Sequence, residues 1–202
     1  MSTTTNFTAK DVQELRQRTG AGMMDAKKAL EETHGDMDKA AELLRAKGIA
    51  KAEKRAGRSA SEGMIGSYIH HNHKVGVMVE VNCETDFVAR TDDFKALVKE
   101  LALHIASAAP LAVDKDGVDP AVVERERRIY EQQVKESGKP EHLIPKIVEG
   151  KVEAFYKEAV LLSQPWIREP KKSVGDLVKE ASAKLGEHVS VKRFVRYQLG
   201  QE

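Results

Sequence analysis

The sequence predicts an α+β fold, in which a small helical domain precedes a core domain with an antiparallel sheet and packed helices. Residues 1–48 contain three short segments whose apolar residues recur at helical spacing. Residues 61–202 contain a strand hairpin, then several helical segments, then another alternating strand. This order of helices, hairpin, helices and strand is typical of an α+β domain with an antiparallel sheet.

Three short helices are predicted in the N-terminal segment. Thr8 is a suitable N-cap for the first helix, and Gly20 ends it. The second runs from about residue 22 to 34, and the third follows a cap at Asp36 and ends at Gly48. The predicted inward positions are Met23, Ala26, Leu30, Ala40, Leu43 and Leu44. Because three such helices bury only a small core, this domain is more suited to docking than to catalysis.

Residues 49–60 are strongly basic, with only Glu53 against four cations. The cations are Lys51, Lys54, Arg55 and Arg58. We interpret this stretch as a solvated, partly helical linker. RNA binding is the alternative, although no aromatic residue is interleaved there for base stacking.

The core domain begins with a predicted hairpin. In residues 75–83, valines alternate with Gly76, Met78, Glu80 and Asn82, which indicates a half-buried strand. Residues 64–69 can pair with it across the polar turn 70–74, and residues 189–199 form a further strand. The intervening helices are predicted from about Asp92 to Pro110, from Pro120 to Ser137 behind a cap at Asp119, from about Glu141 to Leu162, and after caps at Ser173 and Asp176. The second and third of these are expected to form a paired helical hairpin.

The composition fits a soluble protein. Charged residues make up 32% of the chain and apolar residues 41%, which argues against a membrane span or a disordered tail. The formal net charge of +1 argues against a general nucleic-acid binder. A single cysteine, Cys83, excludes an internal disulfide framework, and residues 1–10 lack an apolar signal core. We therefore expect a cytoplasmic protein with no membrane partner.

Residues 19–25, with two glycines, superficially suggest a phosphate-binding loop. The Lys-Ser/Thr pair of such a loop is missing and no strand precedes it, so a tight turn between helices is the better interpretation. Met23 and Met24 are neighbours on a helix and cannot both face one core. At least one should be exposed, and an exposed methionine suits a docking surface.

Two other clusters have simple structural explanations. His70, His71 and His73 lie in the predicted turn, where solvent exposure explains them better than a metal site without further ligands. Cys83 continues the inward register of the valines, which favours a buried, inert thiol over a nucleophile. We therefore predict no catalytic residue, no bound metal and no cofactor.

The segment from Asn82 to Arg90 follows the point where the strand pattern breaks. A strand-to-helix corner there would present Asp86 and Phe87 outward. The alternative places Phe87 in the core and Asp86 as a helix cap, and the pattern alone leaves both open. An acid–base pair of Glu84 and Asp86 has no convergent partner in the sequence.

The last strand mixes basic and aromatic residues. Its cations are Lys192, Arg193 and Arg196, and its aromatic residues are Phe194 and Tyr197. Such a strand can bind RNA on an exposed sheet. The isolated charge cluster and the neutral total favour instead a strand that is part core and part interface.

Several blocks of the sequence, in order, resemble the elongation factor Ts family over essentially the whole chain. These blocks are Leu15-Arg16 with Thr-Gly-Ala-Gly-Met-Met-Asp at 19–25, Lys27-Lys28-Ala29-Leu30, residues 82–90, and Lys192-Arg193-Phe194-Val195-Arg196-Tyr197. Many relatives carry cysteine where this chain has Ala26. Many also have a duplicated core and a coiled-coil insertion, whereas this chain resembles the short form with one core copy.

The resemblance implies two domains: a ubiquitin-associated-like (UBA-like) docking domain at residues 1–48, and an α+β core at 61–202 that also mediates dimerisation. The basic stretch at 49–60 is the linker between them. It implies a non-catalytic guanine-nucleotide exchange factor that binds elongation factor Tu, in its GDP-bound and nucleotide-free states, during translation elongation. A homodimer is expected, with no direct nucleic-acid partner. The alternative function is an RNA-associated translation or ribosome factor.

The resemblance also implies two sets of site residues. The motif associated with dislodging the magnesium ion falls on Thr85, Asp86, Phe87 and Val88, which favours the outward placement of Phe87. Contacts of the N-terminal domain with the partner fall on Arg16, Met23, Met24 and Lys27.

Overall fold

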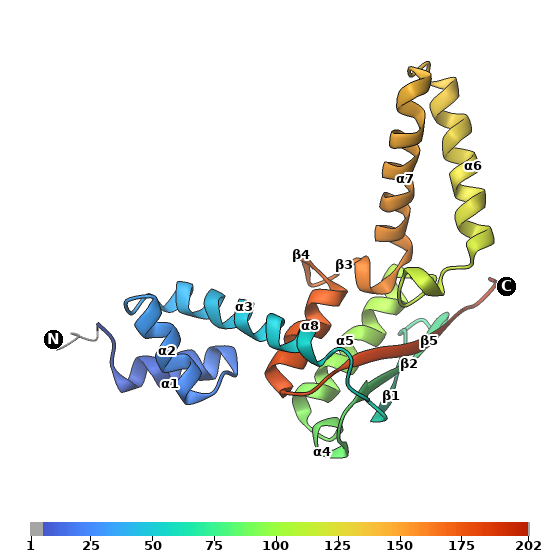
Figure 1. Cartoon of the computed structure of the whole chain (residues 1–202). Coiled ribbons are helices and arrows are strands. Elements are labelled where there is room, and N and C mark those ends of the chain that lie inside the picture. Colours follow the sequence, from blue (N-terminus) through green and yellow to red (C-terminus); the bar gives the residue numbers. More distant parts are fainter. Residues whose placement is uncertain (1–5, 202) are drawn as a thin grey trace. The chain divides into compact units, whose positions relative to one another are not determined.

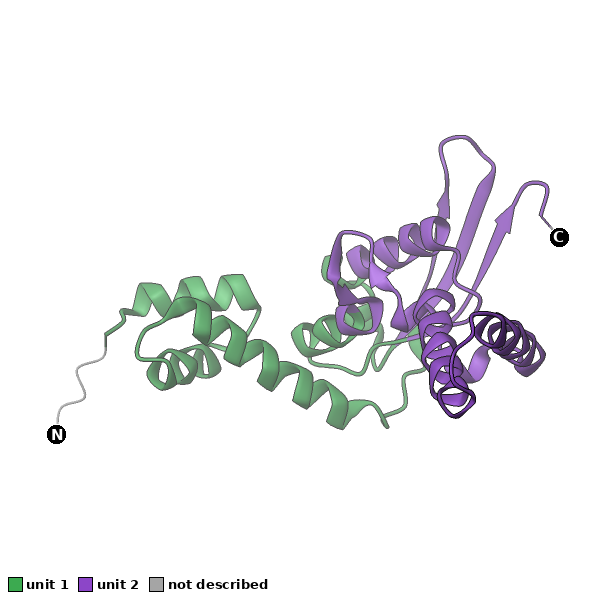
Figure 2. Cartoon of the chain, turned by 90° about the horizontal axis from the view of Figure 1, so that it is seen from above, with its two compact units in different colours: residues 1–63, 83–94, 178–190 green, residues 64–82, 95–177, 191–202 purple. Residues whose placement is uncertain are grey.

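The structure is a computed structural model that describes residues 6–201 (Figure 1). Residues 1–5 of the predicted N-terminal domain and residue 202 of the predicted core domain lie outside the described residues. The chain divides into two compact units, coloured separately in Figure 2. Unit 1 comprises residues 1–63, 83–94 and 178–190, and unit 2 comprises 64–82, 95–177 and 191–202. Each unit is therefore assembled from segments that are distant in the sequence.

Unit 1 begins with the three predicted helices, α1 (Ala9–Thr19), α2 (Met23–Glu32) and α3 (Met37–Arg55). The predicted cap of α1 is confirmed: the Asp11 N–H donates to Thr8 Oγ1 at 3.3 Å, and the Thr8 N–H donates to the Asp11 carboxylate at 2.6 Å. Gly20 ends α1 in a left-handed conformation with φ 69°. The buried residues that hold the three helices together are Val12, Leu15, Ala26, Ala29, Leu30, Ala40 and Leu44.

Helix α3 corrects the prediction that Gly48 ends the third helix. The helix continues through Gly48 to Arg55, so it includes much of the predicted linker. A Cβ atom at Gly48 would lie 3.1 Å from the Cβ of Ala183, which belongs to helix α8 (Val174–Leu185). The glycine therefore serves close packing between two helices, and it does not act as a stop signal here.

Unit 2 contains most of a three-stranded sheet with the order β1 (Glu62–Ile69), β2 (Val75–Cys83) and β5 (Ser190–Gln198). The predicted hairpin and final strand are thus confirmed. Later residues of β5 meet earlier residues of β2, because Arg193 binds Glu80 while the Leu199 N–H donates to the Lys74 carbonyl. This pairing makes β5 antiparallel to β2.

One face of this sheet is covered by helix α5 (Asp92–Ala108). The side chain of Val98 in α5 fills the space beside Gly66 of β1, where a Cβ would lie 2.3 Å from Val98 Cγ1. Arg196 of β5 donates through Nε to the Ala106 carbonyl of the same helix at 3.3 Å. The most buried valines of β2 are Val77, Val79 and Val81.

Helices α6 (Pro120–Glu136) and α7 (Ile144–Ala159) form the predicted helical hairpin and lie side by side (Figure 1). Asp119 caps α6, and its Oδ1 accepts the Ala121 N–H at 2.8 Å. The helix that was predicted to start at about Glu141 begins later, at Ile144, because residues 141–143 form a separate 3₁₀ turn before α7. A small core between the two helices contains Val134, Val148 and Val152.

Two short strands after this hairpin were not predicted. Strand β3 (Pro165–Trp166) pairs antiparallel with β4 (Glu169–Ser173), and α8 follows at once. The predicted cap of α8 is confirmed, since the Asp176 N–H donates to Ser173 Oγ at 3.0 Å. Across residues 6–201, no helix combines the length and apolar character that crossing a bilayer requires.

Candidate functional site

The corner after strand β2 presents an aromatic side chain to solvent. The strand ends at Cys83, and the short helix α4 (Asp86–Ala89) begins two residues later. Phe87 in this helix is 78% exposed, which excludes its placement in the core of this chain. Thr85, not Asp86, is the helix cap, and its Oγ1 accepts the Val88 N–H at 3.4 Å. The outward placement of Phe87 is therefore confirmed.

Asp86 lies beside Phe87 and makes an ion pair along the same segment. Its Oδ2 atom is 2.7 Å from Nη2 of Arg90, and both side chains are substantially exposed. Glu84 interacts elsewhere, with the His188 N–H at 2.6 Å and the Arg58 guanidinium at 3.3 Å. The two carboxylates have different partners, so they do not form a convergent acid–base pair.

The corner is held by the loop that joins α8 to β5. The Glu187 carboxylate in this loop accepts hydrogen bonds from the Glu84 N–H at 3.1 Å, the Thr85 N–H at 3.0 Å and the Thr85 hydroxyl at 2.7 Å. The His188 N–H, followed by the Arg58 charge, holds the pKa of the Glu84 carboxyl below its usual range. Sequence reasoning missed Glu187 and His188, because no local pattern distinguishes them from other polar residues of this chain.

Cys83 is buried directly beneath the corner, as predicted. Its thiol donates to the Thr85 carbonyl at 3.1 Å. Burial raises the pKa of the Cys83 thiol, and the nearby Glu187 carboxylate raises it further. Such a thiol is a structural group and a poor nucleophile.

The predicted contact residues of the N-terminal helices are exposed. Met23 is 48% exposed and Met24 63% exposed at the start of α2, while Arg16 lies on α1. The prediction that Met23 faces the core is wrong, because Ala26, the next member of that face, is the first buried residue of α2. Lys27, also exposed, lies 3.8 Å from the Glu31 carboxylate.

Two of the four cations in the basic segment, Lys51 and Arg58, form ion pairs with acidic residues of unit 1. Lys51 Nζ lies 3.1 Å from the Asp25 carboxylate, and Arg58 binds Glu84 as described above.

In the histidine turn, Tyr68 Oη lies 3.0 Å from His70 Nδ1. In the part of the chain that the structure describes, no group of three or more His, Cys, Asp or Glu side chains is placed to hold a metal ion.

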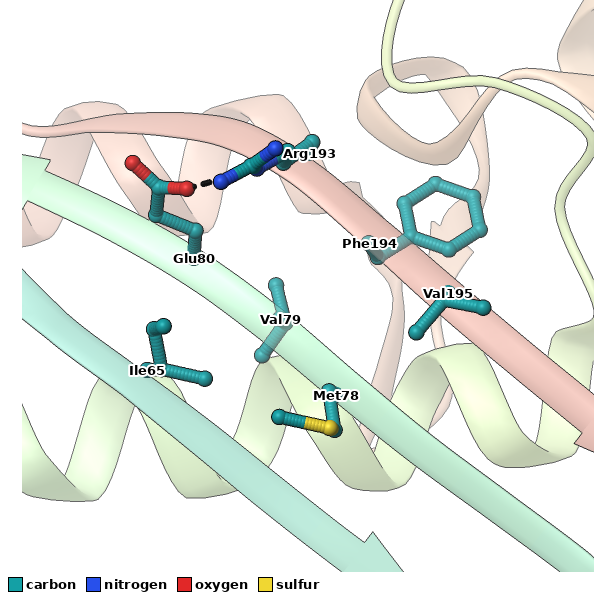
Figure 3. A pocket seen from close by; sticks show the side chains of 7 residues that line it. All are labelled: Ile65, Met78, Val79, Glu80, Arg193, Phe194 and Val195. Carbon is teal, nitrogen blue, oxygen red and sulfur yellow. Dashed lines mark hydrogen bonds and ion pairs between the residues drawn. The ribbon is translucent and has the colours of Figure 1, made fainter.

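A second apolar surface lies on the face of the sheet that α5 does not cover. Glu80 of β2 and Arg193 of β5 meet there at 2.7 Å, and Arg193 holds the pKa of the Glu80 carboxyl below its usual range. A hollow of about 250 Å³ lies beside this ion pair. Figure 3 shows the side chains that line it. Its lining residues are Ile65, Met78, Val79, Glu80, Arg193, Phe194 and Val195.

Comparison with known proteins gives a consistent result. The family model described as "Elongation factor TS" matches residues 2–201. The chain is 56% identical over 196 residues to the elongation factor Ts of Nitratidesulfovibrio vulgaris, covering 97% of this chain and 98% of that protein. It is 53% identical over 195 residues to the elongation factor Ts of Fervidobacterium nodosum, covering 96% and 99% respectively. The chain therefore belongs to the elongation factor Ts family.

Proposed function

We propose that this protein is a guanine-nucleotide exchange factor that binds elongation factor Tu and promotes release of its GDP. Family membership supports a role in translation elongation. The observation that carries the exchange mechanism is the exposed Phe87 on a corner held by several hydrogen bonds. The protein needs no reactive group or cofactor for this role, because the chemistry of GTP belongs to its partner.

The mechanism follows from linkage between two binding equilibria. A GTPase holds GDP through a phosphate-cradling loop and a magnesium ion that demands octahedral geometry. A protein that binds the empty GTPase more tightly than the loaded one must lower nucleotide affinity by the same factor. A coupling free energy of about 2.7 kcal/mol corresponds to roughly a hundredfold weaker nucleotide binding.

Phe87 is the side chain that supplies this coupling in our proposal. A solvent-facing ring gains most when it enters a pocket of the partner, and a buried aromatic anchor contributes about 2–4 kcal/mol to an interface. Asp86 would orient the approach by hydrogen bonding, with Thr85 and Val88 shaping the helical turn that carries the ring. Insertion of this turn would displace the groups that hold magnesium and phosphate.

The N-terminal helices serve as a UBA-like docking domain in this proposal. Their exposed methionines, Met23 and Met24, provide adaptable apolar contact, and the neighbouring cations Arg16 and Lys27 add charge complementarity. Docking of this kind is indifferent to the nucleotide state. It therefore raises the local concentration of the Phe87 corner without changing the partner's affinity for GDP.

We further propose that the functional form is a cytoplasmic homodimer. The uncovered sheet face is apolar at three strands, with Ile65 59% exposed, Met78 51% exposed and Tyr197 72% exposed. A second copy of the same sheet is a suitable occupant, because apolar side chains of two sheets interdigitate when the sheets pack face to face, about 10 Å apart. The Glu80–Arg193 pair also offers each charge a counterpart on the other copy.

One experiment tests the exchange proposal and separates its two surfaces. Release of fluorescent GDP from elongation factor Tu is followed by stopped flow as the concentration of this protein rises. Phe87→Ala should lower the maximal release rate by about a hundredfold, and Met24→Lys should raise the half-saturating concentration with little change in the maximum. Leu111→Ala removes another exposed apolar side chain, at 60% exposure, and serves as the control.

Full exchange activity of Phe87→Ala would contradict the wedge. Salt-sensitive RNA binding by the wild-type protein, without any effect on GDP release, would favour the RNA-associated alternative. Lys51 and Arg58 each form an ion pair with a carboxylate of this chain, and the net charge is only +1. Both observations support the expectation that nucleic acid is not a direct partner.

A further inference from the structure

We propose that Glu187 is a positioning residue that sets the orientation of the Phe87 corner, with Glu84 as its reciprocal partner. This inference rests on the exchange function proposed above. Neither carboxylate would touch elongation factor Tu in order to act. Their role would be to fix the backbone from which Phe87 projects.

Glu187 collects three donors of the corner on one side chain. One oxygen, Oε2, accepts the N–H groups of Glu84 and Thr85, and the other, Oε1, accepts the Thr85 hydroxyl at 2.7 Å. Hydrogen bonds to an ionised acceptor are about twice as strong as neutral ones. Two successive residues that follow β2, Glu84 and Thr85, are therefore bound to one carboxylate on the loop between α8 and β5.

The Glu84 carboxylate returns the contact in the opposite direction. It accepts the N–H of His188, the residue after Glu187, at 2.6 Å. The Arg58 guanidinium approaches the same carboxylate at 3.3 Å, but the Arg58 side chain is 56% exposed and adds little. The segment after β2 and the loop before β5 thus each supply a carboxylate that accepts backbone N–H groups of the other, and we call this arrangement the carboxylate clasp.

The clasp also fixes the direction of the helix cap. The hydroxyl of Thr85 donates its proton to Glu187, which leaves its lone pairs free to accept the Val88 N–H at the start of α4. The Glu187 main chain is itself fixed, because the buried Ser182 donates to its carbonyl oxygen. A continuous hydrogen-bonded path therefore connects α8 to the turn that carries Phe87.

Helix α4 cannot hold this geometry alone. It has four residues, far fewer than an isolated helix needs, and Ala89 is its only buried residue. A flexible corner would lose side-chain and backbone freedom when its aromatic ring enters a pocket, and that loss would subtract from the binding free energy. Removing the clasp should consequently reduce the coupling that Phe87 delivers, while the docking surface on α2 stays intact.

The test uses Glu187→Ala and the conservative Glu187→Gln in the full-length protein. Glu187→Ala should lower the maximal GDP release rate about tenfold and leave the half-saturating concentration within about twofold. Glu187→Gln keeps an oxygen for the two N–H donors, so it should recover part of that loss. Asp93→Ala is the matched control, because Asp93 pairs with Lys184 of α8 at 2.6 Å and makes no bond to the corner.

A second measurement on the free proteins does not depend on exchange activity. Hydrogen–deuterium exchange at the amides of Glu84, Thr85 and Val88 should be faster in Glu187→Ala than in the wild type or Asp93→Ala. Unchanged amide protection overturns the clasp, whatever elongation factor Tu does. A wild-type rate in both Glu187 variants, while Phe87→Ala is impaired, also overturns it. A wild-type protein that fails to release GDP contradicts the exchange function instead, and the amide measurement still decides the clasp.

Discussion

His104 is a buried titratable side chain whose protonation state follows from its neighbours. It lies on α5 with no exposed surface, and its Nε2 is 2.9 Å from Gln164 Oε1. Its Nδ1 accepts the N–H of Ile167 at 3.4 Å, so the ring proton is on Nε2. The Gln164 amide then donates to the carbonyls of Ala108 and Glu158, which satisfies the whole network.

The neutral form of His104 gives a prediction about pH. Burial lowers the pKa of His104 below the ordinary value of 6.5, although the hydrogen bond to Gln164 opposes the shift. The unfolded chain therefore binds a proton at a higher pH than the folded chain does. The contribution of His104 to stability is complete above about pH 6.5 and is lost as the pH falls below that value toward the folded pKa.

Urea unfolding at pH 8 and at pH 5.5 measures this dependence. His104→Gln removes the titrating group, so its stability should change less between the two pH values than that of the wild type. His142→Gln is the control, because His142 is exposed near the tip of the helical hairpin. Equal pH dependence of wild type and His104→Gln would contradict the assigned role.

Local chemistry made the ends of several helices predictable from the sequence. Thr8 with Asp11, and Ser173 with Asp176, form reciprocal hydrogen bonds within four residues of chain. Strand β2 was predictable for a similar reason, since its alternation of valines reflects one buried face. Where the information lies within a few neighbouring residues, sequence reasoning and structure agree.

Contacts between distant segments account for what the sequence did not reveal. Gly48 looks like a helix end, but its neighbour Ala183 in α8 makes the glycine a packing position inside α3. Phe87 could be placed inside or outside by pattern alone, and Glu187, which holds its corner, lies about a hundred residues further along the chain. Family resemblance, not periodicity, pointed to the exposed ring.

Two glycines in unit 2 yield opposite predictions for the elements that contain them. At Gly66 in β1 a Cβ would collide with the buried Val98 of α5, at 2.3 Å, so Gly66→Ala should destabilise the protein by about 1–3 kcal/mol. At Gly150 in α7 nothing lies within 4 Å, so Gly150→Ala should stabilise it by about 0.5–1 kcal/mol. In urea unfolding, Gly66→Ala should have a lower midpoint than the wild type and Gly150→Ala a higher one. The opposite order of the two variants would contradict the prediction.

The exposed apolar face of the sheet is a property of the molecule as a whole. All three strands contribute to it, through Ile65, Met78 and Val195 among others. Monomeric proteins rarely leave a large contiguous apolar patch in water, and such patches usually mark an interface. A stable protein–protein interface buries about 800 Å² on each partner, an area that a three-stranded face with its flanking loops can supply.

Met78→Glu tests whether a second copy covers this face. Met78 lies on the central strand and is 51% exposed, so the substitution should leave the isolated fold intact while placing an unpaired carboxylate in the middle of the proposed interface. Sedimentation equilibrium should therefore give a dimer mass for the wild type and a monomer mass for Met78→Glu at the same micromolar concentration. Leu111→Glu adds the same charge at an exposed apolar position outside the sheet and should remain dimeric. A monomeric wild type, or a dimeric Met78→Glu with an unchanged circular dichroism spectrum, would rule out dimerisation through this face.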